Sequence, residues 1–377
     1  MILLTGATGY IGSYVAADLL RNHTERVAVM VRARDLAHAE ERLWKAWQLH
    51  MPFDEFLAFV RDRVDIVLGE LTETDLGLDA AEWRRLAKQT DSIIHVAASL
   101  NRKSAKACFN VNLRGTLSLL RLARDAQDDH GLRRFSDVST VAVVGRVEHE
   151  LVPETRIVDW DRSDFDPYSR TKKFCEHMVR ELLPDVDHVV FRPSTVLGDS
   201  RFAETTQFDM VRAFVMLANM PVLPFDKSWR MDIVPVDYVA DAIVSIHQAE
   251  RPKYDSYNLS SGAASLSYEH IVDAMAASGH RRPRFVPALE NVFTRTVESL
   301  SNTPKNWKVA LPASLLKVFM PYLVFDTVFD NARVVEELGR TPAPFADYAF
   351  ALFRFATENN FRYPYVPWPA DVEAGRR

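Results

Sequence analysis

The chain begins Met1-Ile-Leu-Leu-Thr-Gly-Ala-Thr-Gly-Tyr-Ile-Gly12, and this stretch decides the fold. An apolar run followed by a glycine-rich turn predicts a buried strand that passes into a helix. Gly6 suits a tight turn, Gly9 lets the backbone approach a phosphate, and Gly12 lets the helix pack closely on the strand. The N-terminus of that helix offers free N–H groups and a positive dipole end to a pyrophosphate. The pattern predicts a dinucleotide-binding turn; the alternative is a glycine-rich turn in an unrelated α/β protein.

The composition is that of an ordinary globular enzyme. The 377 residues include 46 Lys and Arg and 51 Asp and Glu, for a formal net charge of −5. This balance gives no electrostatic basis for binding nucleic acid. Two cysteines, Cys108 and Cys175, are too few for a disulfide framework and lack metal-binding spacing, so we expect buried thiols. Because the first strand starts at Met1, we expect no targeting peptide and a cytoplasmic location.

Apolar and helical segments alternate along the first half of the chain. Continuously apolar short runs are typical of strands buried on both faces of a parallel sheet. After the N-terminal strand, we predict strands at 27–32, 64–68, 92–96, 134–138 and 188–191, and helices at 35–62, 79–89, 104–128 and 166–183. The predicted fold class is α/β: a Rossmann-type doubly wound parallel sheet with a smaller, mostly helical C-terminal substrate domain.

The regular alternation ends near residue 197, and this sets the expected domains. Residues 231–262 contain a short strand and a helix that we expect to return to the first domain. We therefore predict a Rossmann domain over 1–196 with 231–262, and a substrate-binding cap from 197–230 and 263–377.

One apolar stretch, residues 309–329, is about as long as a membrane span. Pro312, Lys317, Pro321 and Asp326 interrupt it, and membrane-spanning helices seldom carry unpaired charges. We favour a pair of helices lining a substrate cavity over a membrane-surface contact or a plain core helix.

Tyr168-Ser-Arg-Thr-Lys172 places a tyrosine and a lysine on one face of an expected helix. The ammonium of Lys172 would lower the pKa of the phenol and could hold a nicotinamide ribose. Tyr168 could then protonate a carbonyl oxygen as hydride arrives. A further hydroxyl, from Ser139 or Thr140 at the end of the fifth strand, could hydrogen-bond the substrate oxygen.

Several segments together resemble the extended short-chain dehydrogenases/reductases, over roughly the first 260 residues. They are Thr5-Gly-Ala-Thr-Gly-Tyr-Ile-Gly12, His95-Val-Ala-Ala98, Asn112-Leu-Arg-Gly-Thr116, Val138-Ser-Thr140, Tyr168-x-x-x-Lys172 and Arg192-Pro-Ser194. In that family the catalytic hydroxyl lies five residues before the glycine closing its segment. Here that glycine is Gly145, so the resemblance selects Thr140. Asn112 matches the asparagine that steadies the active-site helix and, through water, the lysine.

The resemblance implies a catalytic set and a cofactor-binding set. The catalytic set is Thr140, Tyr168 and Lys172 with Asn112. The implied cofactor-binding residues are Gly6, Thr8, Gly9, Tyr10, Ile11, Gly12, Arg32, Arg34, Glu70, Leu71, Ala97, Ala98, Ser139, Tyr168, Lys172, Pro193, Thr195 and Val196. No group of His, Cys, Asp or Glu has metal-ligand spacing, so we expect no metal.

The second predicted strand ends in a basic residue, which bears on the cofactor. Enzymes that use NAD usually place there an acid that binds the ribose diol. This chain has Arg32, with Arg34 nearby and Asp35 following. Because a guanidinium suits a 2′-phosphate by charge and by its bidentate fork, we predict NADPH. The alternative is a pair of solvated arginines.

A narrower resemblance is to the thioester-reductase and fatty-acyl-CoA-reductase branch. It rests on Val31-Arg-Ala-Arg34, Leu68-Gly-Glu-Leu71, Asp75-Leu-Gly-Leu78, Val138-Ser-Thr-Val-Ala-Val-Val-Gly-Arg146 and Arg192-Pro-Ser-Thr-Val-Leu-Gly-Asp-Ser200. It implies reduction of an acyl thioester by NADPH, here in a free-standing version. Two positions depart from the branch. Asp137 stands where an apolar, aromatic or histidine residue is usual, and Glu70 replaces an aspartate near the adenine.

We therefore predict an NADPH-dependent reductase of an acyl thioester, bound to CoA or to an acyl carrier protein. The product would be an aldehyde, with further reduction to the alcohol left open. One alternative is a ketone or aldehyde reductase, or a hydroxysteroid-type dehydrogenase, of the same fold. Another is an NADP-binding sensor without turnover. The sequence leaves the acyl chain, its carrier and the oligomeric state undetermined.

Overall fold

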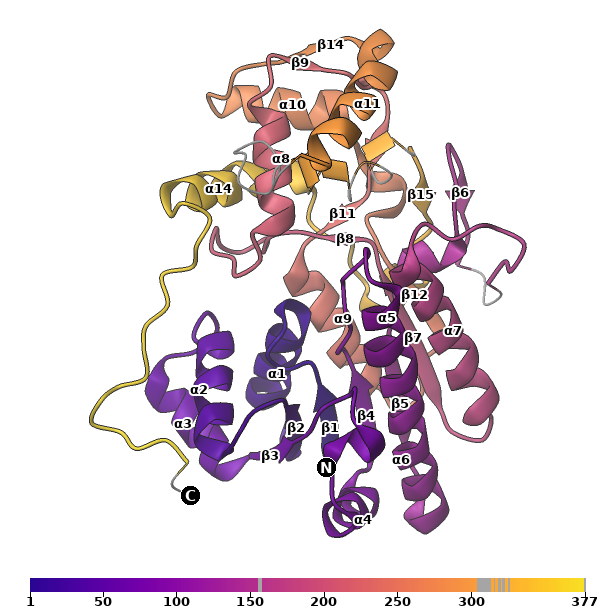
Figure 1. Cartoon of the computed structure of the whole chain (residues 1–377), viewed down its shortest axis with the longest axis vertical. Helices are drawn as coiled ribbons and strands as arrows, with labels where there is room; N and C mark the ends of the chain where they lie inside the picture. Colours follow the sequence, from indigo (N-terminus) through magenta and orange to yellow (C-terminus); the bar gives the residue numbers. More distant parts are fainter. Residues whose placement is uncertain are drawn as a thin grey trace.

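Seven parallel strands form a central sheet in the computed structural model (Figure 1), which describes residues 1–154, 158–303, 313–314, 316–317, 320, 323–324 and 326–375. The order across the sheet is β12-β7-β5-β4-β1-β2-β3. The bounds are β1 Ile2–Thr5, β2 Val27–Val31, β3 Val64–Leu68, β4 Ser92–His95, β5 Arg134–Val138, β7 His188–Pro193 and β12 Ser256–Leu259. Strand order reverses between β1 and β4, which is where doubly wound sheets bind ligands. The predicted fold class is confirmed.

Helices cover both faces of the sheet. One face carries α1 (Tyr10–Asn22), α2 (Leu36–Trp47), α3 (Phe53–Asp62) and α9 (Val236–Gln248), and the other carries α4 (Ala80–Gln89), α6 (Gly115–His130) and α7 (Pro167–Leu182). Successive β1 residues point to opposite faces, so Leu4 packs with the first set and Leu3 with the second. Both side chains are fully buried, as expected from continuously apolar strands.

Two predicted helices are each divided in the structure. The segment 35–62 breaks between α2 and α3 at Pro52, which has no N–H to donate and stands as the N-cap of α3. The segment 104–128 contains α5 (Ala105–Cys108), a π-helical turn over Phe109–Arg114 and then α6. Such turns place a side chain out of the regular helical register, and here they carry Asn112.

Beyond β7 the chain builds a second layer of structure, drawn at the top of Figure 1. It includes α8 (Asp209–Ala218), α10 (Tyr268–Ala277), α11 (Glu290–Ser301) and α14 (Phe345–Glu358), around an apolar cluster of their own. Between these elements, α9 packs on α1 and β12 pairs with β7. The return of the chain to the sheet fits the predicted segment 231–262, although β12 was not predicted because Ser256 and Asn258 interrupt its apolar pattern. The domain boundaries stay a prediction.

About half of the apolar stretch 309–329 lies outside the described residues. Leu316, Met320 and Leu323 are described, and each is buried in the upper apolar cluster. Among the described residues, no helix has the length and apolar character needed to span a membrane.

After α14 the chain runs back to the lower layer as an extended C-terminal strap over residues 359–375 (Figure 1). The backbone of Val366 exchanges hydrogen bonds with the Gln48 side chain and accepts one from Trp44 Nε1 at 3.1 Å. The Trp368 ring meets Phe53 edge-on at 5.0 Å. The strap thus joins the upper layer to α2 and α3.

Candidate active site

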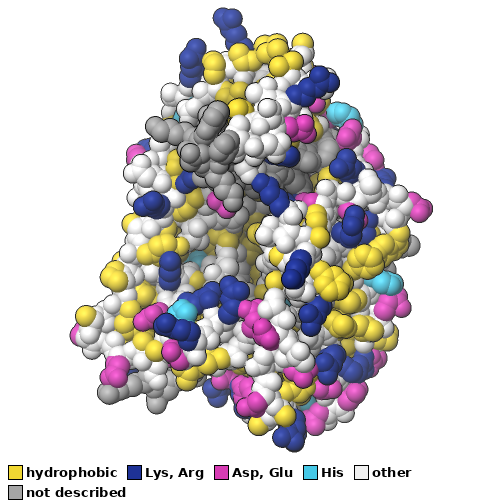
Figure 2. Space-filling model, in the orientation of Figure 1, with side chains coloured by type: hydrophobic (Ala, Val, Ile, Leu, Met, Phe, Trp, Pro, Cys, Tyr) yellow, Lys and Arg dark blue, Asp and Glu magenta, His cyan; other side chains and the backbone are white. Residues whose placement is uncertain are grey.

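A cavity of about 480 Å³ lies at the carboxyl ends of the strands, between the sheet and the upper layer. Figure 2 shows the surface hollowed between these two parts of the molecule. Most of the predicted site residues line it: Gly6, Thr8, Gly9, Tyr10, Ile11, Gly12, Arg32, Glu70, Leu71, Ala97, Ala98, Ser139, Thr140, Tyr168, Pro193, Thr195 and Val196. Arg34, Asn112 and Lys172 do not. Arg34 is exposed, whereas Asn112 and Lys172 are buried behind the wall.

The glycine turn after β1 forms one end of the cavity. Gly6 has φ +79°, and a Cβ there would lie 2.7 Å from the backbone N of Ala97. A Cβ on Gly12 would lie 2.0 Å from the carbonyl oxygen of Gly6. Gly9 is the N-cap of α1 and has no side chain over the free N–H groups of the first turn. The turn therefore offers a cradle that fits a diphosphate at the N-terminus of α1.

Tyr168 lies in the first turn of α7, where local sequence sets the helix start. Asp166 accepts a hydrogen bond from Ser169 N at 2.8 Å in a capping box, and Pro167 occupies the first helical position. The Arg102 guanidinium lies over the Tyr168 ring, 4.8 Å from its centroid. Burial raises the pKa of the Tyr168 phenol, while the charges of Lys172 and Arg102 act to lower it. The phenol is therefore protonated at neutral pH and able to donate.

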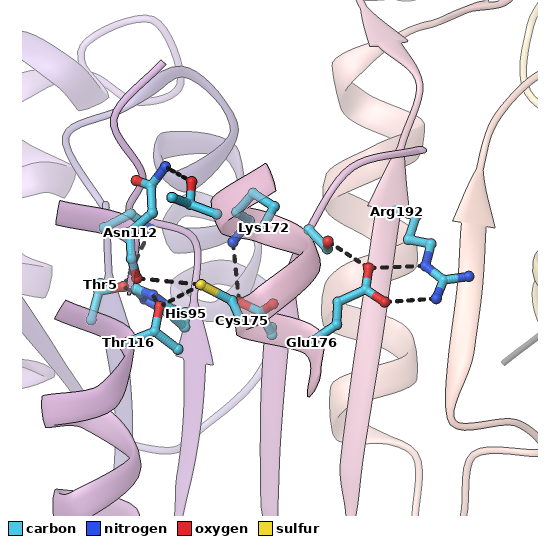
Figure 3. Close-up of polar contacts among 12 residues, drawn as sticks. Thr5, His95, Asn112, Thr116, Lys172, Cys175, Glu176 and Arg192 are labelled. Atoms are coloured by element: carbon cyan, nitrogen blue, oxygen red, sulfur yellow. Dashed lines mark hydrogen bonds and ion pairs between the residues drawn. The ribbon is translucent and has the colours of Figure 1, made fainter. Parts of the chain in front are cut away.

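Lys172 lies one turn beyond Tyr168 and is paired with a carboxylate from β5. Its Nζ is 3.3 Å from Asp137 Oδ1, and both side chains are almost fully buried (Figure 3). Burial acts to lower the pKa of Lys172, but Asp137, together with Cys175 and Tyr168, raises it and leaves that pKa above the usual value. The ammonium is therefore charged inside the protein.

The two candidate hydroxyls after β5 have different surroundings. Ser139 Oγ donates to Glu176 Oε1 at 2.6 Å, and Glu176 is held by Arg192 at 2.6 Å (Figure 3). Thr140 Oγ1 accepts one long hydrogen bond, 3.3 Å from Ala142 N. Because the Ser139 hydroxyl is committed to Glu176, Thr140 is the hydroxyl with capacity left to meet a substrate.

Asn112 ties three segments together. Its Oδ1 accepts from Ser99 N at 2.7 Å, and its Nδ2 donates to Ser99 O and to Thr171 Oγ1 on α7. It makes no direct contact with Lys172 in these bonds, so it is a positioning residue. His95 is likewise structural: it is fully buried between Thr5 and Thr116 (Figure 3), and burial keeps its pKa well below the usual value.

The end of the cavity beside β2 holds arginines, one of them missed by sequence analysis. Arg32 Nη1 pairs with Glu70 Oε2 at 3.2 Å. Arg42, on α2, lines the cavity and donates to the backbone carbonyl of Arg32. In the sequence Arg42 is one of many polar residues on a long helix, so no local signal marks it. Arg42, rather than Arg34, accompanies Arg32.

Comparison with known families agrees with this geometry. Residues 4–243 match the family model of NAD-binding proteins described as "Male sterility protein". The chain belongs to this family. The match covers the glycine turn and the elements that carry Thr140, Tyr168 and Lys172, and it confirms the predicted resemblance to the reductases.

The curated relatives that this family member matches are much longer chains. This chain is 32% identical over 271 residues to an isonitrile lipopeptide synthase of Mycobacterium tuberculosis, covering 64% of this chain and 10% of that one. It is 29% identical over 289 residues to a carboxylic acid reductase of Mycobacterium marinum, covering 68% and 24%. The chain therefore spans a tenth to a quarter of these relatives.

Solved structures support the same fold. The terminal R domain of the myxalamid PKS-NRPS biosynthetic pathway matches with a TM-score of 0.81 at 24% identity, covering 96% of this chain and 91% of that one. A thiolation–reductase di-domain from an archaeal non-ribosomal peptide synthetase matches with a TM-score of 0.73 at 18% identity, covering 96% and 75%.

Further residues line the cavity that were not among the predicted site residues, although Phe329 falls in the stretch 309–329 that we expected to line a substrate cavity. Leu100, Phe165, Met210 and Phe329 supply apolar surface, and Arg230 and Asp232 supply polar groups, all of them lining the cavity. They come from separate loops, from α8, and from the short strands β10 (Arg230–Met231) and β15 (Val328–Phe329). Only the fold brings them together beside Tyr168.

Proposed function

We propose that the protein is an NADPH-dependent reductase of acyl thioesters. The observation that carries the proposal is a single cavity that begins at the glycine turn and is lined by Tyr168 and Thr140. The rest of the cavity lining is mainly apolar, from Leu100, Phe165, Met210 and Phe329, and suits an acyl group. The carboxylic acid reductase and the R domains among its relatives support an acyl substrate at the acid oxidation level.

A bound nicotinamide would supply hydride to the carbonyl carbon. The chain's own groups then act on the oxygen. Thr140 Oγ1 donates a hydrogen bond to the oxyanion as its charge grows. Tyr168 donates its phenolic proton to the same oxygen, and Lys172, charged and buried beside it, stabilises the phenolate that remains. Proton donation of this kind contributes on the order of 10²–10⁴-fold in rate.

With a thioester, the first product is a hemithioacetal. It collapses when the C–S bond breaks, the thiol leaves with a proton and the aldehyde remains. No enzyme thiol is required for this route. Cys108 and Cys175 do not line the cavity, and burial raises the pKa of both thiols, that of Cys175 to about 11.

The thiol carrier is proposed to be a carrier protein. The archaeal relative joins a thiolation domain to its reductase, and the lipopeptide synthase is ten times the length of the matching region. For the cofactor, Arg32 and Arg42 support NADPH over NADH. Two guanidinium groups at the end of β2 suit a 2′-phosphate by charge and by geometry.

The test is oxidation of the cofactor in the presence of defined substrates. The purified chain would be given NADPH with acyl-CoA, acyl pantetheine, and an acylated carrier protein, and in parallel with aldehydes and ketones. We expect thioester-dependent NADPH oxidation with release of free thiol. Turnover of ketones or aldehydes alone would identify a carbonyl reductase of the same fold, and NADPH binding without any turnover would identify a sensor.

A further inference from the structure

A buried acid stands on β5 where the fold calls for an apolar residue. Phe135, two positions earlier on the same face, packs in the apolar cluster with Val179 of α7 and with Leu183, the residue after that helix. Asp137 is fully buried at the next position on that face, and its Oδ2 has no hydrogen-bond partner. An unpartnered oxygen of a buried carboxylate is costly. A residue that destabilises the fold in this way is expected to have a function other than stabilising the core.

The contact made by the other oxygen indicates that role. Asp137 Oδ1 is 3.3 Å from Lys172 Nζ, and each side chain is at most 1% exposed. The nearest competing anion, Glu176, is occupied by Arg192 and lies 3.5 Å from Arg180. Among the described residues, Asp137 is therefore the carboxyl group paired with Lys172; burial raises the pKa of Asp137, and the charge of Lys172 acts to lower it.

The other titratable groups around this pair do not replace Asp137. They are Tyr168, Cys175 and Glu176 on α7 and His95 on β4, with Arg180 farther along α7. The Cys175 thiol and the Tyr168 phenol are neutral at physiological pH, since burial raises the pKa of both. His95 is neutral as well, because burial and the charge of Lys172 lower its pKa.

From this arrangement we propose that Asp137 is a positioning residue that keeps Lys172 protonated and directed toward β5 below the cavity. The inference rests on the proposed function, because Lys172 acts there as a cation. An ammonium moved from water into a site of this depth loses its proton readily unless an anion lies beside it. Asp137 supplies that anion through Oδ1, while its Oδ2 stays buried without a hydrogen-bond partner.

The decisive variant is Asp137→Asn, which keeps the size of the side chain and an oxygen to accept from Lys172 but removes the charge. We expect the alkaline limb of the pH profile for kcat/KM to move down by about one to three pH units. The family resemblance implies that Lys172 Nζ also hydrogen-bonds the nicotinamide ribose when NADPH is bound. NADPH affinity, measured by fluorescence titration, should therefore weaken by about tenfold over the same pH range, because that charged hydrogen bond becomes a neutral one. Below that limb, rate and affinity should approach those of the parent protein.

A matched control lies one residue away. Ser136 is also fully buried on β5, but it faces the opposite side and bonds His247 at 2.8 Å. Ser136→Ala should lose a buried hydrogen bond and leave both pH profiles in place. Thermal denaturation of the two variants would show that each is folded during the measurements.

The outcomes separate this inference from the function on which it rests. Unchanged pH profiles in folded Asp137→Asn would overturn it. A shifted alkaline limb of kcat/KM together with an NADPH affinity that does not change with pH would also overturn it, because the titrating group would then be Tyr168 and not Lys172. A pH-independent loss of activity with normal NADPH binding would overturn it too. If the parent protein reduces no thioester, the proposed function fails, and the NADPH titration still tests Asp137.

Discussion

Replacing Arg42 by glutamine should change which dinucleotide the protein prefers. Arg42 lines the cavity beside Arg32 at the end of β2, and its guanidinium is anchored on the Arg32 carbonyl oxygen. Glutamine keeps a polar side chain that can donate there but removes the positive charge. NADPH carries a 2′-phosphate that NADH lacks, so the loss should fall on NADPH alone.

The size of the effect follows from the exposure of the two arginines. A hydrogen bond to a charged group contributes about 1.5–3 kcal/mol, which corresponds to roughly 10- to 150-fold in affinity. Arg32 has a side chain 71% exposed and is paired with Glu70, so its contribution is expected near or below the lower limit. Arg42 is partly buried on α2. We expect Arg42→Gln to weaken NADPH binding by about 10- to 100-fold and NADH binding by less than about twofold.

Fluorescence titration with each dinucleotide would measure these affinities directly, without any substrate. Arg34→Gln is the matched control, because Arg34 lies two residues from Arg32 but is exposed and away from the cavity. Equal losses for NADPH and NADH in Arg42→Gln would refute the reasoning. An effect of Arg34→Gln as large as that of Arg42→Gln would do the same.

Three further outcomes are expected. Tyr168→Phe should lower kcat by about 10²–10⁴-fold and leave NADPH affinity nearly unchanged; activity at the parent level would exclude the phenol as proton donor. Gly12→Ala should abolish measurable NADPH binding, because its Cβ would lie 2.0 Å from the Gly6 carbonyl oxygen and displace the turn. Burial against Tyr14 lowers the pKa of His50 to about 4, so the unfolded chain takes up a proton on this imidazole below about pH 6.5 and the folded chain does not. Stability should therefore fall by up to about 1.4 kcal/mol per pH unit between pH 6.5 and 4, and His50→Gln should reduce that slope in denaturant titrations; an unchanged slope would contradict the assignment.

The sequence was most informative where the chemistry depends on neighbouring residues. The first twelve residues determine a strand, a turn and a helix because each glycine acts within one turn of backbone. Tyr168 and Lys172 share a helix face through the helical repeat, and Asp166 and Pro167 begin that helix through bonds spanning three residues. These local rules predicted the doubly wound sheet and the glycine turn, and the family resemblance supplied most of the predicted residues that line the cavity.

Only the tertiary structure decided the contacts between distant segments. Asp137 and Lys172 are 35 residues apart, and their pairing depends on which face of β5 meets α7. Arg42 reaches the cavity because α2 packs against α1 and β3. Val366 bonds Gln48 across 318 residues. The large sequence separation between these contacting residues explains why the sequence alone did not predict the contacts. Helix and turn signals arise from interactions a few residues long, whereas strand order and side-chain facing arise from burying the whole apolar surface at once, which no single segment encodes.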